Sequence, residues 1–189
     1  MGDVRDRSMV VADGRVVAWT ECGPVDGVPV LRMPGMPGCR WTLRADRSPW
    51  SERSLRVITT ERPGFGTSPR RPGRGFAEHA ADVAEILDHL GLARVWVYGS
   101  SGAAPHILAF AAAYPQRVRA VSIMAGAAPM SYAEAEAETM IPVNVRGRQL
   151  ARAGDVEGLC ALLEPIRMAM LADPLAGFRV LMAQAPPAD

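Results

Sequence analysis

The chain has 189 residues, 49% of them hydrophobic, which is enough to bury the core of one ordinary domain. Its formal net charge is only +1, which argues against nucleic acid or an anionic membrane as the main partner. Three widely spaced cysteines predict neither a disulfide framework nor a metal site, and no stretch is apolar enough to span a bilayer. We therefore expect a cytoplasmic protein. The richest basic stretch, Arg70–Arg74, is typical of a solvated loop.

The first third of the sequence alternates short apolar runs with turns. The predicted strands of this region are Met9–Val11, Val16–Thr20, Val28–Met33 and Leu55–Thr59. The pair Asp13-Gly14 between the first two runs is typical of a hairpin turn. The third run leads into the Pro/Gly-rich segment Pro34–Gly38, and the fourth leads into Glu61–Ser68.

A predicted helix follows, in which apolar residues recur at helical spacing at Phe76, Ala80, Val83, Leu87 and Leu90. Four acidic residues lie off that stripe, at Glu78, Asp82, Glu85 and Asp88. Gly91 is a C-cap signal that ends the helix. Two further strands are predicted at Arg94–Tyr98 and Val118–Met124.

Between these two strands lies the most informative segment of the chain. An apolar run ends at Gly99, Ser101 follows after one residue, and a helix-forming stretch begins at Ala104. A sharp turn from strand to helix tolerates only small residues two places before and after its serine, and Gly99 and Ala103 meet that demand. The pattern predicts that the Ser101 hydroxyl is lifted above the sheet.

This order of motifs resembles the α/β-hydrolase family over residues 8–130, and more loosely beyond. The turn at Ser101 is similar to the family's Gly-x-Ser-x-Gly elbow, with Ala103 in place of the second glycine. Pro34–Gly38 is similar to the His-Gly-x-Pro-Gly oxyanion loop, with proline in place of histidine. Glu61–Ser68 resembles the family's Asp-Arg-Pro-Gly-Tyr-Gly-x-Ser.

The resemblance implies an α/β fold with a mostly parallel sheet, helices on both faces and a helical cap. Residues 1–130 would form the N-terminal part of the core, and residues 131–189 the cap. Helical patterns in the cap are interrupted at Pro142, Gly147, Gly154, Pro165 and Pro174. By resemblance, we expect the last strands of the sheet to be missing from this chain.

The resemblance also implies roles for particular residues. Ser101 would be the nucleophile, and the backbone amides of Met36 and Gly102 would stabilise the oxyanion. The residues that support this loop and elbow would be Gly35, Gly99 and Ala103. Ser100 is an alternative nucleophile, but it occupies the variable position of the elbow. No metal or organic cofactor is implied.

The proton-transferring pair of a catalytic triad is not found in the sequence. The family order is serine, then acid, then histidine, and the only histidine after Ser101 is His106. It lies on the elbow helix about 140° around from Ser101, so we expect it to be a packing residue. His79 and His89 precede the serine, and we expect the first to pack inward and the second to be solvated.

Three interpretations follow. The first is a serine hydrolase, impaired in this chain, that cleaves an ester or similar acyl bond of a small apolar substrate. A serine elbow disfavours dehalogenase and epoxide-hydrolase chemistry, where the family nucleophile is aspartate. The second is a non-catalytic binding protein, and the third is half of a split protein. Because Val118–Met124 would lack an outer neighbour, self-association through that sheet edge is also predicted.

Overall fold

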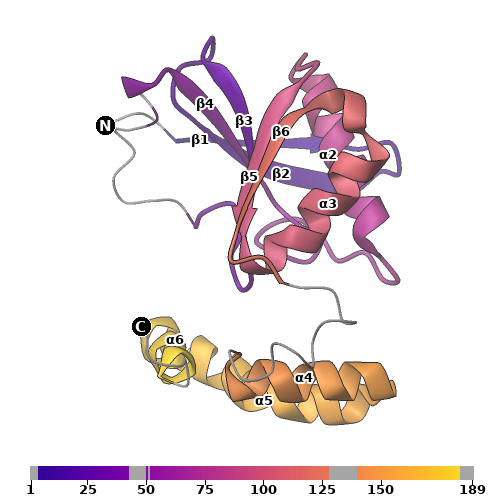
Figure 1. Ribbon diagram of the computed structural model, residues 1–189, viewed down its shortest axis with the longest axis vertical. Coiled ribbons are helices and arrows are strands. Elements are labelled where there is room, and N and C mark those ends of the chain that lie inside the picture. Colours follow the sequence, from indigo (N-terminus) through magenta and orange to yellow (C-terminus); the bar gives the residue numbers. More distant parts are fainter. Residues whose placement is uncertain (1–3, 43–49, 51, 128–139, 184–189) are drawn as a thin grey trace. The chain divides into compact units, whose positions relative to one another are not determined.

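The computed structural model describes residues 4–42, 50, 52–127 and 140–183. The chain divides into two compact units, Met1–Ala127 and Ala128–Asp189 (Figure 1). The boundary that the sequence predicts, between residues 130 and 131, lies outside the described residues.

The first unit is built on a six-stranded sheet with the order β1-β2-β4-β3-β5-β6. Its strands are β1 Arg5–Val10, β2 Val16–Cys22, β3 Val28–Met33, β4 Leu55–Thr60, β5 Val95–Ser100 and β6 Val118–Met124. The β1–β2 and β2–β4 pairs are antiparallel, whereas β4, β3, β5 and β6 are mutually parallel. The carboxyl ends of β3, β4 and β5 therefore meet at one edge, beside the point where the strand order reverses.

The predicted strands are present, and two of them, β3 and β6, have the predicted bounds. The largest difference is in β1, which begins at Arg5 rather than Met9. Arg5 pairs with Glu21 and Val10 with Val16, so the ladder with β2 continues through a polar segment. An edge strand tolerates such polar residues because one side faces solvent.

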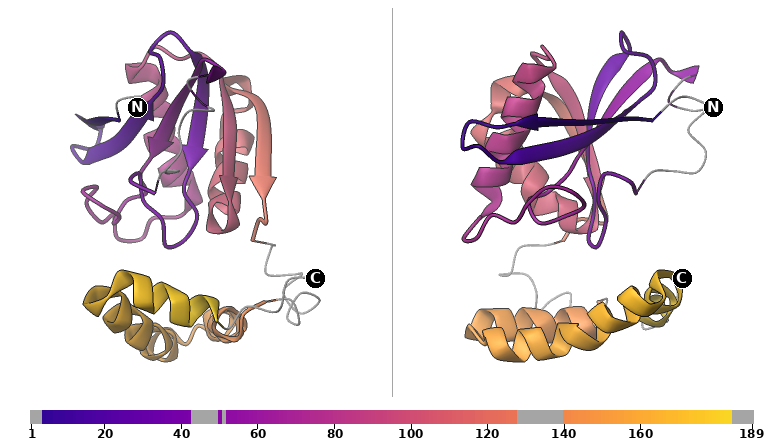
Figure 2. Two further views of the ribbon diagram at one scale, coloured as in Figure 1. Left: turned by 90° about the vertical axis from the view of Figure 1, so that its left-hand side faces the viewer. Right: turned by 180° about the vertical axis from the view of Figure 1, so that it is seen from behind.

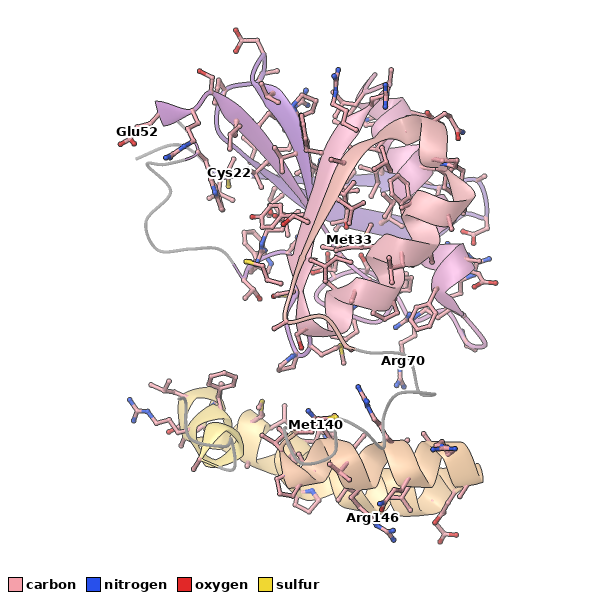
Figure 3. All side chains as sticks on the ribbon, in the orientation of Figure 1. Cys22, Met33, Glu52, Arg70, Met140 and Arg146 are labelled. Atoms are coloured by element: carbon pink, nitrogen blue, oxygen red, sulfur yellow. The ribbon has the colours of Figure 1, made fainter. Side chains whose placement is uncertain are left out.

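Helices α2, Phe76–His89, and α3, Ala104–Ala113, both lie on one face of the sheet (Figure 2). The core between helices and sheet contains Leu31, Met33, Val83, Leu87, Val97, Ile107 and Phe110, all at most 2% exposed. Figure 3 shows Met33 inside this layer. The sequence predicts helices on both faces of the sheet. In the described ranges, α2 and α3 provide them on one face.

Two residues of α2 differ from the predicted stripe. Phe76 is 48% exposed, because it occupies the first turn of the helix, beyond the covered core. Asp82 is buried rather than solvated, and its carboxylate lies 2.5 Å from the Arg15 guanidinium. This ion pair, together with the bond from the Ala12 amide to the Glu85 carboxylate, fastens the β1–β2 hairpin to α2.

The opposite face of the sheet is covered over β2 and β4, where Cys22, Trp50 and Val57 form a small buried cluster. Towards β5 and β6 that face opens, and Trp96 is 46% exposed. Among the described residues, no strand pairs with the outer edge of β6.

Within the described residues, the second unit contains α4 Pro142–Ala153, α5 Val156–Ala172 and α6 Pro174–Met182. The helix ends follow the predicted interruptions only in part, since Gly147 and Pro165 lie inside α4 and α5. A Cβ at Gly147 would stand 3.7 Å from Leu159 Cδ1, so this glycine belongs to the contact between two helices. No helix in the described ranges is long and apolar enough to cross a membrane.

Candidate active site

Ser101 stands at the junction between β5 and α3. The strand ends at Ser100, a single 3₁₀ turn spans Ser101–Ala103, and α3 follows at once. Ser101 has a φ of 53°, a left-handed conformation that costs energy in any residue with a side chain. The side chain of Ser101 is exposed, and the predicted strand–turn–helix arrangement is therefore present around it.

Glycine is required on the inner side of this turn. A Cβ at Gly99 would stand 2.5 Å from the Met33 carbonyl oxygen and 2.9 Å from the Ala103 Cβ, closer than such atoms approach. Ala103 itself is fully buried, so the alanine that replaces the family's second glycine fits without displacing its neighbours. The close contact of β5 with β3 and α3 thus depends on Gly99.

The Pro34–Gly38 segment lies directly against the turn. A Cβ at Gly35 would stand 3.0 Å from the Ser100 carbonyl oxygen and 3.5 Å from the Ser101 Cβ. A Cβ at Gly102 would stand 3.4 Å from the Met36 backbone nitrogen. The structure therefore brings Ser101, Gly102 and Met36 together, as the sequence predicts, although their chemical roles stay predictions.

A buried arginine holds the Pro34–Gly38 segment in place. The Arg62 guanidinium donates to the carbonyl oxygens of Pro34, Gly35 and Gly38, the last two at 3.0 and 2.9 Å. It also stacks on the Phe65 ring, 4.4 Å from the ring centroid. Three carbonyls gripped by one rigid fork fix the path of the loop that carries the Met36 amide.

Arg62 is unusual because its hydrogen-bonding partners in the described part of the chain are neutral groups. Burial lowers the pKa of Arg62 to about 10, and the nearby Arg74 charge acts in the same direction. The sequence places Arg62 inside the Glu61–Ser68 motif, but the pattern alone predicts no role for it. Its position after a strand and before Pro63-Gly64 was the available signal.

The Glu61–Ser68 loop, which carries Arg62, is organised around the Glu61 carboxylate. Its Oε2 lies 2.6 Å from the Arg40 guanidinium and accepts from the Thr67 backbone N–H at 3.1 Å. A Cβ at Gly66, whose φ is 52°, would collide with the same carboxylate. The hydrogen bonds that Arg40 donates to Asp6 and to Glu61 raise the pKa of Arg40 against the effect of its burial. The loop that presents Arg62 is therefore anchored by a buried ion pair.

The histidines lie where the sequence predicts and do not serve the nucleophile. His79 and His106 are buried against each other, with their Nδ1 atoms 3.0 Å apart. His89 is exposed and contacts the edge of Trp19. In the described part of the chain, none of the three histidines forms a hydrogen bond with Ser101.

Two of the hollows on the described part of the sheet unit lie at opposite ends of the parallel strands. The larger, about 600 Å³, is lined by residues that precede β5 and β6, such as Leu92 and Gln116, and is remote from the elbow. Ligands of open α/β sheets bind at the carboxyl ends of the strands, so this hollow is not the substrate site. Among the described residues, no cluster of three metal-ligating side chains occurs.

The comparisons agree with this architecture. A family model described as alpha/beta hydrolase fold matches residues 28–181. A 2-hydroxy-6-oxo-2,4-heptadienoate hydrolase of Pseudomonas putida is 33% identical over 126 residues, which are 66% of this chain and 45% of that protein. A proline iminopeptidase of Neisseria meningitidis is 28% identical over 58% of this chain and 36% of that protein. This chain spans 25% of the uncharacterized hydrolase YcgS of Bacillus subtilis. It spans 31% of the dihydrolipoyllysine-residue acetyltransferase component of the acetoin cleaving system of Pseudomonas putida.

Solved structures show the same fold. Cfl2 of Burkholderia cenocepacia aligns with a TM-score of 0.59 at 20% identity, over 96% of this chain and 72% of that chain. Epoxide hydrolase A of Mycobacterium thermoresistibile aligns with a TM-score of 0.59 at 18% identity, over 78% of this chain and 52% of that chain. Identities this low establish a shared fold and leave the reaction open.

Proposed function

The chain belongs to the alpha/beta hydrolase fold family, and we propose that it provides the nucleophile and oxyanion site of a serine hydrolase. Ser101 attacks an ester or similar acyl bond of a small apolar substrate, and the amides of Met36 and Gly102 stabilise the oxyanion that forms. The observation that carries the proposal is the left-handed Ser101 in contact with the Pro34–Gly38 loop.

Acyl chemistry is favoured over the other reactions that the relatives represent. Similar proteins are named as an epoxide hydrolase, a haloalkane dehalogenase, a 2-hydroxy-6-oxo-2,4-heptadienoate hydrolase and a proline iminopeptidase. Epoxide and haloalkane opening in this family use an aspartate at the elbow, where this chain has Ser101. Serine esters are intermediates of acyl transfer, so a serine at this position supports ester or related acyl substrates.

Proton transfer from the serine needs a base, and the described residues do not place a histidine at Ser101. A serine without its base is a weak nucleophile, although oxyanion donors and binding leave residual catalysis over water. We therefore expect this chain to hydrolyse p-nitrophenyl esters far more slowly than ordinary enzymes, which turn over at about 1–10³ per second.

The experiment compares Ser101→Ala with Ser100→Ala in that assay. We expect the slow hydrolysis to fall to the uncatalysed rate in Ser101→Ala and to persist in Ser100→Ala, because Ser101 has the left-handed conformation of the turn and Ser100 still belongs to the strand. Loss of the hydrolysis in Ser100→Ala alone would contradict the assignment to Ser101 and make Ser100 the nucleophile. Equal residual rates in wild type and both variants would overturn catalysis through the elbow.

One observation favours a second candidate, a binding protein that keeps the fold without catalysis. All three histidines of the chain are committed elsewhere or exposed: His79 and His106 to each other and His89 beside Trp19. In that case a non-hydrolysable ester analogue would bind, and Ser101→Ala would leave its affinity unchanged.

A further inference from the structure

The second hollow of the sheet unit lies beside the loop that follows β4. It has a volume of about 360 Å³, within the range of about 300–1,000 Å³ that ligand pockets occupy. Its walls are formed by Pro63, Phe65, Pro72 and the three arginines Arg70, Arg71 and Arg74. Figure 3 shows Arg70 on the same side of the sheet as the carboxyl ends of its parallel strands.

The charges around this hollow do not balance. No lining residue carries a carboxylate. Arg71 lies near Asp13 and Asp82, at 3.7 and 3.8 Å, and both acids also bind Arg15 at shorter distances. In the described part of the chain, neither Arg70 nor Arg74 forms an ion pair, so two guanidinium groups are left without counterions.

The nearest acid on the neighbouring helix is already in use. The Glu78 carboxylate accepts the Gly75 backbone N–H at 2.7 Å and caps the start of α2. The Arg74 charge also acts, together with the larger effect of burial, to lower the pKa of Arg62, the residue that holds the Pro34–Gly38 loop. A positive potential therefore extends from this hollow towards the Pro34–Gly38 loop.

We propose that this hollow binds a phosphate-type dianion, either free or as the phosphate group of a small organic molecule. Two unpaired guanidinium groups match the charge of about −2 that a phosphate monoester carries near pH 7. Planar guanidinium forks bind such oxyanions through paired, charge-assisted hydrogen bonds. A single carboxylate would leave one arginine unmatched. Phe65 provides an apolar wall for an organic group, and its ring also stacks on Arg62.

The site uses no atom of Ser101, so it stands or fails separately from the proposed hydrolysis. Calorimetry of the whole chain with inorganic phosphate and with phenyl phosphate, at low ionic strength, provides the test. We expect saturable binding of both, weakened by about tenfold or more in the double variant Arg70→Met/Arg74→Met because charge-assisted bonds are lost. Tighter binding of phenyl phosphate would identify an organic phosphate as the ligand, and equal binding would identify free phosphate.

The matched control is Arg119→Met/Arg179→Met, which removes the same net charge at two exposed positions that do not line the hollow. Binding in this control should equal that of the wild type. In the wild type, phosphate should also shift the NMR signals of the Arg70 and Arg74 side-chain Nε–H groups, a readout that needs no variant. Absence of saturation, or an equal loss in both double variants, would overturn the proposal and leave only non-specific charge attraction.

Discussion

Arg62 occupies a buried position in which three backbone carbonyls, rather than a carboxylate, receive its hydrogen bonds. The planar fork of the guanidinium reaches all three at once, which a lysine ammonium on a flexible stem does not. Arg62 is therefore a positioning residue, since it acts on the Met36 amide through the shape of the Pro34–Gly38 loop.

Replacement of Arg62 should loosen that loop. We expect Arg62→Met to increase the hydrogen-exchange rate of the Gly38 amide, which donates to the Gly35 carbonyl at 2.8 Å, by about tenfold or more. Arg62→Lys should give an intermediate rate, because it keeps the charge and loses the fork. Arg119→Met serves as control. An unchanged Gly38 rate in Arg62→Met would remove Arg62 from the account of the loop.

The contacts of individual side chains with partners distant in the sequence could not be predicted. The small residues around Ser101 were predictable, because the backbone itself requires Gly99 there. The burial of Asp82 was not, because its partner Arg15 lies 67 residues away in the sequence and helical periodicity records only the local face. Arg62 was missed for the same reason, since its three acceptors lie on another loop.

At the scale of elements, the buried pair His79 and His106 joins α2 to α3. Burial lowers the pKa of His106 to about 4, with Arg62 and Arg74 adding to the effect. Burial likewise lowers the pKa of His79, and the neighbouring His106 acts in the same direction. Both rings are therefore neutral in the folded protein at neutral pH.

The free energy of unfolding should consequently depend on pH. Unfolded histidine has a pKa of about 6.5, so between pH 6.5 and 4 the unfolded chain binds more protons than the folded chain. Stability is then complete above that window and decreases as the pH falls through it. The His106 shift alone predicts a loss of about 2 kcal/mol at pH 5 relative to pH 8.

Urea titrations at several pH values measure this dependence. His106→Gln should flatten the curve between pH 7 and 5. A wild-type free energy of unfolding that stays constant between pH 7 and 5 would contradict the burial of two neutral histidines.

The bounds of other strands and helices could be predicted from sequence patterns only in part. β3 and β6 were predicted with their observed bounds because apolar residues fill them, while the polar start of β1 depends on its pairing with β2. Pro165 was expected to interrupt a helix and lies inside α5, where one missing hydrogen bond is tolerated. Self-association through the outer edge of β6 stays a prediction.

For the whole molecule, the mostly parallel sheet and the family were within reach of the sequence. A hairpin followed by strands alternating with helices predicts such a sheet, and β4, β3, β5 and β6 are mutually parallel. The chain spans part of the length of its curated relatives, 45% in the case of the Pseudomonas putida hydrolase. No residue of the described site is therefore assigned as the acid or the base of the reaction.

The central claim is that Ser101 and the backbone amides of Met36 and Gly102 form one reacting centre. An alkylboronic acid adds to a serine hydroxyl to give a tetrahedral anion, so amide NMR spectra recorded during its titration test that claim directly. We expect the Met36 and Gly102 amide signals to move most, and to stay in place in Ser101→Ala. Shifts at other amides, with those two unchanged, would contradict the account.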